Sequence, residues 1–564
     1  PGGPMGVPVR INRPEDVPYW RQEAPALVVQ GEDVFVTWGL AHPKATPQQP
    51  FATELRLSRS NDGGKTFQAS VLVNDDPGVI QHTFDALHRD AEGRLHLSWI
   101  DGREVFGNAQ FEVRYPYTGE VIGSAPRLTR EDVAAVLDSA ANRRFSLSRH
   151  ERAQILNRIA DRLQAEEDDF ATLITLESGL ALKDTRYELR RAQDVFRFAA
   201  MEALRDDGQV FACDTSANGK NRRAYTLREP LRLVAAITPF NHPLNQVAHK
   251  VAPSIATNNV MVLKPSGRTP LAALRLARIM REAGLPDGMV TMVTGDAEEV
   301  GPILWQHPAV ELVSLTGGTE IGKRVANELG YRRAILELGG NDPLIVLGDA
   351  DIDEAVRLAT YGAFKNSGQR CTAVKRIIVE DSVADAVAEG VAAGAATLRV
   401  GDPLDPETDI GTVIAERDAI EFERRMNDAL AAGATLRYGG QRRGAQITPT
   451  VLDHVTPEME IVGCETFGPY APIIRVPDLD AAIATANQQD FGLSSGVVTN
   501  DLRAINRCVR ELRCGTVNIR EVPGYRTELT PFGGTKDSGL GVKEGVIEAM
   551  KAMTFTKLYT LPWE

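Results

Sequence analysis

A cysteine at position 371 stands in the stretch YGAFKNSGQRCTAVKR, residues 361–376, between a glycine-containing loop and a β-like run. Arg370 precedes Cys371 directly, and Lys375 and Arg376 follow it closely. A thiolate attacks carbonyl carbons and a thiol does not, so neighbouring positive charge would favour the reactive form. The stretch therefore predicts a nucleophilic cysteine. The alternative is a buried cysteine in a tight turn.

Two further polar side chains end strand-like runs and could complete such a site. Asn241 lies in ITPFNHPLN, where its amide could donate a hydrogen bond to a developing oxyanion. Glu337 lies in LELGGND, where a carboxylate could remove a proton from water. Ligands bind at strand ends of parallel sheets, which favours both roles. The alternatives are a turn asparagine and an exposed strand-end glutamate.

Two other stretches indicate contacts with a phosphate-bearing ligand. Gly317 and Gly318 stand in LTGGTEIG, where a glycine pair lets the backbone of a helix start approach a pyrophosphate. The segment ETFGP places an acid, Glu465, and an aromatic ring, Phe467, before a turn. Each stretch is unspecific alone, and the signal comes from the order and spacing of all of them.

The pattern of apolar runs predicts the elements that hold these residues. From residue 231, continuous apolar runs alternate with helical segments, and a second series of this kind spans about 340–520. Such runs indicate parallel sheets covered on both faces, an α/β fold. Long helices are expected over 130–204, with Thr129 as the first N-cap. The polar segment 206–230 is expected to project as a hairpin used for oligomer contacts.

Residues 1–104 have a different character. Short β-like runs separated by Gly, Asp and Asn turns indicate an all-β segment. SNDGGKTF resembles the Asp-box of sialidase-like β-propellers, in which Asp62 would be a structural turn residue. Only about two blades' worth of sequence is present, and a propeller needs at least four. We interpret the segment as a propeller fragment without activity; a glycan-binding or sialidase-like function is the alternative.

The length, the net charge and the cysteine content exclude several classes of protein. The 564 residues suffice for roughly three or four domains, and the net charge of −13 argues against nucleic-acid binding. The five cysteines show no CxxC pair and no metal-ligand spacing, which favours a reducing, cytoplasmic location without a metal site. No apolar run reaches about 18 residues, so no membrane span is expected. The first residues lack the apolar segment of a signal peptide.

Together, the quoted stretches resemble the aldehyde dehydrogenase superfamily over about residues 109–564. The resemblance implies a Rossmann-like cofactor domain over 105–338, an α/β catalytic domain over 339–520, and a return to the cofactor domain with an oligomerisation tail over 521–564. It also implies NAD(P)-dependent oxidation of an aldehyde to its acid by a homodimer or homotetramer.

The resemblance further implies roles for individual residues. Cys371 would add to the aldehyde, Asn241 and the backbone N–H of Cys371 would hold the oxyanion, and Glu337 would activate the water that cleaves the resulting thioester. The implied contacts with NAD or NADP are Lys264, Ser266, Arg268, Gly317, Gly318, Glu465 and Phe467.

Longer phrases, such as ITPFNHPLNQVAHKVAPSIATNN and EVPGYRTELTPFGGTKDSGLG, resemble the phosphonoacetaldehyde dehydrogenase subfamily. The expected substrate is therefore a small anionic aldehyde, phosphonoacetaldehyde, whose phosphonate a guanidinium binds in a forked geometry. The alternatives are succinate semialdehyde, sulfoacetaldehyde and glyceraldehyde 3-phosphate. The expected substrate contacts are Arg191, His242, Arg370 and Arg526.

One departure from the superfamily pattern concerns the cofactor. The stretch Lys264-Pro-Ser-Gly267-Arg268 lacks the acid that would hold the adenosine ribose hydroxyls of NAD. Loss of that carboxylate removes repulsion against a 2′-phosphate, and Arg268 could attract it. NADP is therefore expected to be accepted, with NAD as the alternative.

Overall fold

The computed structural model describes residues 109–205 and 208–563, together with short strands in the preceding part of the chain. The chain divides into two compact units, Pro1–Phe106 and Gly107–Glu564.

The described residues of the first unit form short strands. Four strands form an antiparallel sheet in chain order, β1 (Ala26–Gln30), β2 (Asp33–Ala41), β3 (Thr53–Ser60) and β4 (Val71–Leu72). β5 (His88–Arg89) pairs with β6 (Leu95–His96). Asp62 and the other residues of the Asp-box after Ser60 lie outside the described residues.

The second unit begins with a hairpin and four helices. The hairpin consists of β7 (Gln110–Arg114) and β8 (Val121–Pro126), and the helices are α1 (Arg130–Ala141), α2 (Arg149–Ala165), α3 (Glu167–Ser178) and α4 (Leu182–Ala203). The Thr129 side chain accepts a hydrogen bond from the backbone N–H of Asp132, whose carboxylate accepts one from the Thr129 backbone. The predicted N-cap is therefore confirmed, and it satisfies N–H groups that have no partner within the helix.

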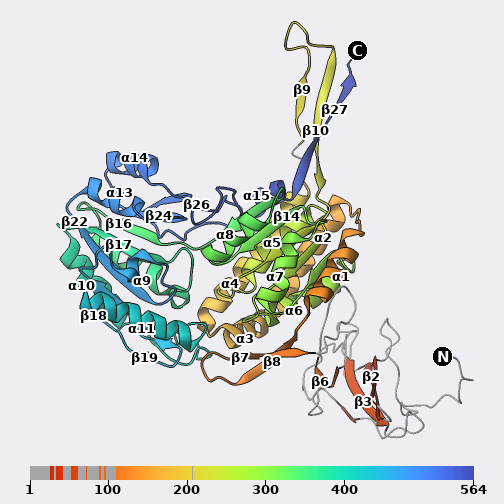
Figure 1. Cartoon of the computed structure of the whole chain (residues 1–564), viewed down its shortest axis with the longest axis horizontal. Helices are drawn as coiled ribbons and strands as arrows, with labels where there is room; N and C mark the ends of the chain where they lie inside the picture. Colours follow the sequence, from red (N-terminus) through yellow and green to blue (C-terminus); the bar gives the residue numbers. More distant parts are fainter. Residues whose placement is uncertain are drawn as a thin grey trace, which may run out of the picture. The chain divides into compact units, whose positions relative to one another are not determined.

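A parallel five-stranded sheet forms the first core of this unit (Figure 1). In space the order is β13 (Val290–Met292), β12 (Met261–Lys264), β11 (Val234–Ile237), β14 (Leu312–Thr316) and β15 (Arg333–Glu337). The connecting helices are α5 (Asn245–Ala256), α6 (Leu271–Glu282), α7 (Ala297–Gln306) and α8 (Thr319–Glu328). The strands advance first in one direction from β11 and then in the other, so right-handed crossovers place α5 and α6 opposite α7 and α8.

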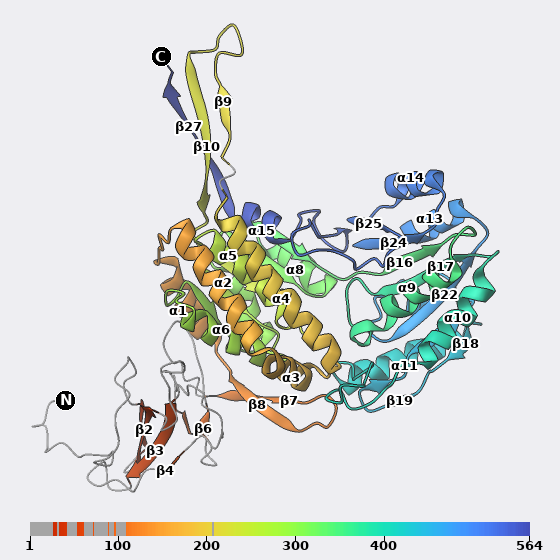
Figure 2. The same cartoon turned by 180° about the vertical axis from the view of Figure 1, so that it is seen from behind.

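The remaining helices extend these two layers. α4 packs on α5, and α1 packs on α7, so helices cover both faces of the sheet (Figure 2). This double cover explains why the strands are apolar along their whole length.

A second, seven-stranded sheet follows in the order β18 (Thr435–Tyr438), β21 (Thr450–Asp453), β22 (Tyr470–Val476), β17 (Val374–Glu380), β16 (Asp342–Val346), β24 (Ser494–Val498) and β25 (Thr516–Ile519). Its pairs are parallel except for β18 with β21. On β16, Leu344 and Val346 pack with residues of α9 (Ile352–Phe364) and α10 (Ala384–Ala396). Ile345 belongs to the core that includes α11 (Glu416–Ala431), α13 (Leu479–Asn487) and α14 (Leu502–Glu511).

Short elements complete this part of the chain. They are the 3-10 helix η1 (Lys365–Gly368), α12 (Glu460–Gly463), and the pairs β19 (Arg442–Arg443) with β20 (Gln446–Ile447) and β23 (Phe491–Gly492) with β26 (Thr535–Lys536).

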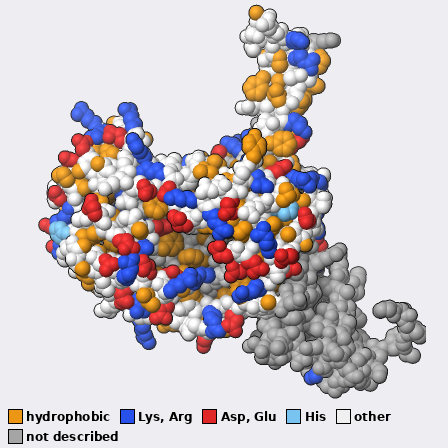
Figure 3. All heavy atoms as spheres, in the orientation of Figure 1, with side chains coloured by type: hydrophobic (Ala, Val, Ile, Leu, Met, Phe, Trp, Pro, Cys, Tyr) orange, Lys and Arg blue, Asp and Glu red, His pale blue; other side chains and the backbone are white. Residues whose placement is uncertain are grey.

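An arm of three antiparallel strands projects from the unit (Figure 1). It consists of β9 (Val210–Ala212), β10 (Arg222–Pro230) and β27 (Thr554–Pro562), the last of which follows α15 (Val546–Ala552). Hydrophobic side chains are exposed along the arm (Figure 3), among them Val210, Phe211, Leu558, Tyr559, Leu561 and Trp563. None of the helices in the described part of the chain is long and apolar enough to cross a membrane.

Candidate active site

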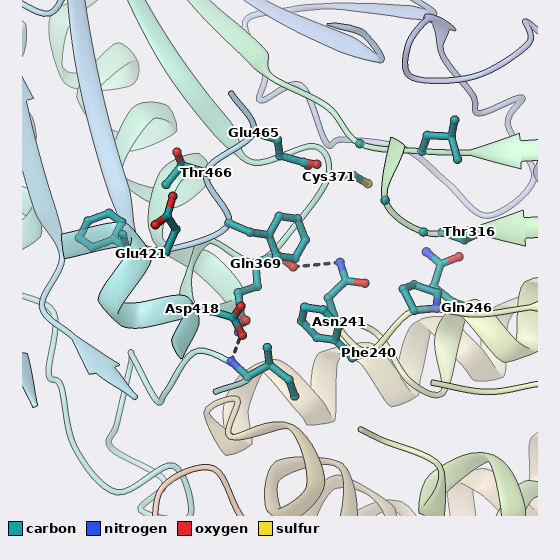
Figure 4. Close-up of a pocket in the computed structure, with 18 of the residues that line it drawn as sticks. Phe240, Asn241, Gln246, Thr316, Gln369, Cys371, Asp418, Glu421, Glu465 and Thr466 are labelled. Carbon is teal, nitrogen blue, oxygen red and sulfur yellow. Dashed lines mark hydrogen bonds between the residues drawn. The ribbon is translucent and has the colours of Figure 1, made fainter. Parts of the chain in front are cut away.

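A cavity of about 330 Å³ lies where loops of the two sheets meet. On one side are the loops that follow β11 and β14, neighbouring strands whose onward connections run in opposite directions. Such a switch point leaves a crevice at the strand ends, because the two loops turn apart. On the other side are the segments that precede β17 and β22. Six residues singled out in the sequence line this cavity, namely Asn241, Gly317, Gly318, Cys371, Glu465 and Phe467 (Figure 4).

Cys371 reaches the cavity from the short loop between η1 and β17. Burial raises the pKa of its thiol to about 11, although the Lys375 ammonium lowers it. Arg370, its neighbour in sequence, turns its guanidinium to the carbonyl of Gly362 at 2.6 Å. The prediction that adjacent cations hold the sulfur as a thiolate is therefore wrong for the protein without ligands, because desolvation outweighs their attraction.

Asn241 is positioned by the loop that carries the cysteine. Its Nδ2 donates to the carbonyl of Gln369 at 2.9 Å, and Asn366 Nδ2 donates to the backbone carbonyl of Asn241 at 3.1 Å. Asn366 and Ser367 have left-handed backbone conformations, with φ of 61° and 51°. Such conformations cost energy in non-glycine residues and are often kept at functional sites. They allow the loop to bring Asn241 and Cys371 to the same cavity.

The glycine turn after β14 fits a phosphate-bearing cofactor. Gly318 is the N-cap of α8 without a side-chain cap, and a Cβ added there would meet nothing within 4 Å. Helix N–H groups at such an open end favour a pyrophosphate. The nearby oxygens Thr316 Oγ1 and Gln246 Oε1 are buried at the same cavity without a hydrogen-bond partner in the described structure. These residues fit a dinucleotide that would satisfy them.

Glu465 and Phe467 are linked by one buried lysine. Lys375 Nζ donates to Glu465 Oε1 at 2.7 Å and lies 4.7 Å from the ring centroid of Phe467. The Phe467 ring meets Phe240 edge-on, with centroids 5.9 Å apart. This arrangement fixes an acid and an aromatic wall beside Cys371.

Glu337 ends β15 beside the cavity, whereas its neighbours Leu338 and Gly339 line it. The side chain is buried, and neither carboxylate oxygen has a hydrogen-bond partner in the described part of the chain. Burial raises the pKa of Glu337 well above its ordinary value, and the Glu544 carboxylate raises it further. Burial therefore favours the protonated form of this carboxyl group more than water does, and Glu337 must be ionised to act as a base.

A buried ion pair lies next to Glu337. Lys250, fully buried on α5, donates to Glu544 Oε1 at 2.5 Å. Lys250 lowers the pKa of Glu337, which opposes the effect of burial. The pair joins residues 294 positions apart, and no sequence pattern singled it out.

Cations converge on His242, the residue after Asn241. Burial lowers the pKa of His242 well below 6.5, and four nearby cations lower it further. The imidazole is therefore neutral at pH 7 and can serve as a hydrogen-bonding group rather than a positive charge. The four cations are Arg191, Arg370, Arg526 and Lys365, of which the sequence predicted all but Lys365 as substrate contacts.

The predicted arginines have partners of different kinds. Arg191 Nε lies 2.5 Å from Glu528 Oε1, and the other oxygen of Glu528 lies 2.5 Å from His249 Nε2. The guanidinium of Arg526 stacks 3.9 Å from the centroid of Phe532. Two buried nitrogens, Arg370 Nε and Arg526 Nη1, have no hydrogen-bond partner in the described structure. An anion bound here would satisfy donors that are otherwise costly to bury.

Three predicted cofactor contacts do not line the cavity of Cys371. Lys264 is buried at the end of β12, and the Ser266 hydroxyl accepts from the backbone N–H of Arg268 at 3.2 Å. Arg268 lines a second hollow together with Gly267 and the β7–β8 hairpin. The two hollows share Ile414, so Arg268 faces a neighbouring space.

Several residues of the site escaped the sequence analysis. Asn366 and Lys365 stand within the same stretch as Cys371. The sequence did not indicate the left-handed φ of Asn366, because the residue is not a glycine. Glu528 follows Arg526 by two positions, and its contact with Arg191 spans 337 residues. Only the spatial structure brings these groups together.

Comparisons with known proteins agree with this geometry. The profile of the aldehyde dehydrogenase family matches residues 99–559. The 3-sulfolactaldehyde dehydrogenase of Priestia aryabhattai is 36% identical over 464 residues, which are 82% of this chain and 97% of the relative. The structure of aldehyde dehydrogenase 21 from Physcomitrella patens in complex with the reaction product succinate matches with a TM-score of 0.80 and 32% identity, over 83% of this chain and 98% of its own.

A third match is the glyceraldehyde-3-phosphate dehydrogenase GapN from Methanocaldococcus jannaschii complexed with NADP. Its TM-score is 0.77 at 35% identity, over 81% of this chain and 100% of its own. None of the three carries the name phosphonoacetaldehyde dehydrogenase, and none of these findings supports the propeller resemblance of residues 1–104. Because the family profile covers most of the chain and the relatives match over nearly their whole length, the chain belongs to the aldehyde dehydrogenase family.

Proposed function

We propose that this aldehyde dehydrogenase oxidises a small anionic aldehyde with NAD or NADP, and that phosphonoacetaldehyde is the first candidate. The observation that carries the proposal is the ring of cations around His242, directly beside Asn241, with unpaired nitrogens on Arg370 and Arg526. The names of the three relatives supply further support, because they refer to a sulfonate, a carboxylate and a phosphate. Succinate semialdehyde, sulfoacetaldehyde and glyceraldehyde 3-phosphate are the other candidates.

In the first half of the proposed reaction, the thiol of Cys371 releases its proton to water, and the resulting thiolate forms a bond to the carbonyl carbon. The carbonyl oxygen becomes an oxyanion that accepts hydrogen bonds from Asn241 Nδ2 and the backbone N–H of Cys371. Loss of one such donor typically costs roughly 3 kcal/mol of transition-state stabilisation. Collapse of the oxyanion would expel hydride and leave a thioester on Cys371, and an oxidised nicotinamide would supply the hydride acceptor. Glu465 and Phe467 would hold its ribose and ring.

In the second half, water cleaves the thioester. Glu337 accepts a proton from the attacking water, the C–S bond breaks, and the sulfur of Cys371 leaves as the carboxylic acid forms. Lys250 favours the ionised form of Glu337 that this step needs. The anionic end of the substrate would be held by Arg191, Arg370, Arg526 and the neutral His242.

The larger organisation is also part of the proposal. We assign cofactor binding to 105–338, the nucleophile to 339–520, and oligomer contacts to the arm formed by 206–230 and the tail of 521–564. The exposed apolar side chains of the arm support a homodimer or homotetramer. The five cysteines form no disulfide, which supports a cytoplasmic location.

A panel of aldehydes tests the proposed function. We expect kcat/KM for the anionic aldehydes to exceed that for uncharged propionaldehyde by about 100-fold, because a charged hydrogen-bonded contact contributes a few kcal/mol. Phosphonoacetaldehyde is expected to give the highest value. Production of NAD(P)H is the readout, and a preference for propionaldehyde would contradict the proposal.

Two adjacent arginines provide a matched pair for this test. Arg191→Ala is expected to raise KM for the anionic aldehydes by about tenfold or more, with a smaller effect on propionaldehyde. Arg190→Ala is the control, because Arg190 is exposed on the same helix and pairs with Glu167. Equal effects of the two substitutions would remove Arg191 from the substrate site.

Position 267 tests the proposed acceptance of NADP. Gly267 is exposed, and a Cβ added there would meet nothing within 4 Å, so Gly267→Glu can be accommodated. A carboxylate there would repel a 2′-phosphate and favour NAD. We expect the wild type to use NADP, and Gly267→Glu to shift the ratio of kcat/KM for NADP to that for NAD by at least about tenfold toward NAD. A thousand-fold NAD preference in the wild type would rule out this assignment.

A further inference from the structure

We propose that Lys365 is a further specificity-determining residue, which captures the anionic group of the aldehyde at the entrance to the site. This inference rests on the proposed function and deepens it. Lys365 follows α9 directly and stands six positions before Cys371.

The ammonium group of Lys365 is held between two tyrosines. It lies 3.3 Å from the ring centroid of Tyr187 on α4 and 4.8 Å from that of Tyr361 on α9, and it donates to Tyr361 Oη at 2.7 Å. Both aromatic faces attract the cation and fix its position without neutralising it. Lys365 is thus a preorganised positive charge.

This charge has no salt bridge in the described part of the chain, although Asp184 is close enough to raise its pKa. Lys365 forms no ion pair with a carboxylate there, and its polar contact is with the neutral Tyr361. Asp184, the acid that raises the pKa of Lys365, uses Oδ2 to accept the backbone N–H of Asn366 at 2.9 Å. In contrast, Arg191 is already paired with Glu528. An ammonium without a salt bridge at a partly buried position favours binding of an anion.

Lys365 also continues the cationic cluster toward the surface. The guanidinium carbon of Arg191 lies 6.0 Å from the same Tyr187 ring, so the two cations share one aromatic neighbour. Tyr187 and Tyr361 are 48% and 45% exposed, whereas Arg370 is only 9% exposed. The cations therefore extend from Lys365, between two half-exposed tyrosines, to the buried Arg370 next to the nucleophile. An anion captured at the entrance can pass to the inner guanidinium groups without losing its positive partners.

The variant Lys365→Met removes the charge and keeps a long apolar side chain. We expect KM for succinate semialdehyde to rise about 10- to 100-fold, with kcat within about twofold of wild type and no comparable change for propionaldehyde. Lys365→Arg is expected to keep most of the wild-type affinity for succinate semialdehyde. The matched control is Lys551→Met, an exposed lysine on α15 that pairs with Glu548.

A pH series gives a second readout. Burial lowers the pKa of Lys365 to about 8, Asp184 raises it, and neighbouring arginines lower it. The lysine is charged below this pH, so the ratio of kcat/KM for succinate semialdehyde to that for propionaldehyde should fall as pH rises through about 8. The ratio cancels the titration of Cys371, and it should be flat in Lys365→Met. The groups that face Lys365 are Asp184, Tyr187, Arg191, Tyr361 and Arg370.

The outcomes separate this inference from the function on which it rests. If the wild type shows no preference for anionic aldehydes, the proposed function fails and the Lys365 role fails with it. If the wild type prefers them and Lys365→Met keeps that preference, only the Lys365 role is overturned. Equal losses toward charged and uncharged aldehydes, or a lowered melting temperature with no change of KM ratio, would also overturn it.

Discussion

Replacement of Cys371 by alanine is expected to abolish aldehyde oxidation, lowering kcat/KM by at least about 10⁴-fold. Without the sulfur no bond forms to the carbonyl carbon. No tetrahedral intermediate then forms from which hydride could be released. The measurement is NAD(P)H formation at saturating aldehyde.

The control for this substitution is Cys213→Ser. Cys213 follows β9 in the projecting arm, does not line the cavity, and is partly exposed. This variant should retain wild-type activity and melting temperature. Substantial oxidation by a folded Cys371→Ala protein would place the nucleophile elsewhere.

The raised pKa of Cys371 adds a dependence on pH. In the absence of cofactor, the rate of iodoacetamide alkylation of Cys371 should keep rising about tenfold per pH unit, since only the thiolate reacts and its pKa is about 11. A rate that levels off by pH 8 would show that the cations beside the sulfur prevail over burial after all.

The second large effect is expected from Glu337→Gln. The glutamine keeps the shape of the side chain but cannot accept a proton, and loss of a general base typically costs 10²- to 10⁴-fold. Oxidation in the first turnover does not need this base, so a burst of NAD(P)H equal to the number of sites should remain. Steady-state turnover should fall by about 10²-fold or more. Rapid-mixing kinetics distinguish the burst from the steady state.

The pH profile of kcat checks the same residue independently. Because the pKa of Glu337 is raised above its ordinary value, the carboxyl is protonated below that raised pKa and turnover should fall as pH decreases through it. Glu337→Gln should lose this dependence. Glu299→Gln, an exposed glutamate on α7, is the control and should keep it. A wild-type kcat that stays constant down to pH 5 would contradict the assignment of the buried Glu337 as the base.

The features that sequence analysis anticipated depend on local patterns. The cap of α1 needs only Thr129 and Asp132, three positions apart, and the parallel sheets follow from apolar runs that must be covered on both faces. Asn241 and Gly317 follow neighbouring strands of one parallel sheet, and its topology brings such positions to one edge.

The features that it missed depend on distant partners. The thiol of Cys371 was expected to be ionised because Arg370 is its neighbour in sequence, yet that guanidinium turns to a backbone carbonyl. The state of Glu337 depends on Lys250 and Glu544, which meet only in the folded chain. Desolvation is a property of the whole surrounding core, so adjacency in sequence cannot reveal it.

The arginines illustrate the same limit for substrate recognition. Sequence alone suggested Arg191 as a phosphonate contact, but its Nε is occupied by Glu528, which leaves the other guanidinium nitrogens for an anion. It did not suggest Lys365, because a lysine at the end of a helix is ordinarily a solvated surface charge.

The most direct test of the central role of Cys371 is mass spectrometry of the Glu337→Gln protein after mixing with NADP and the aldehyde. Trypsin cleaves after Arg370 and Lys375, which isolates the peptide CTAVK. We predict that this peptide gains the mass of the acyl group and loses it on treatment with hydroxylamine, which cleaves thioesters. An unmodified CTAVK peptide from protein that has produced NADPH would contradict the account.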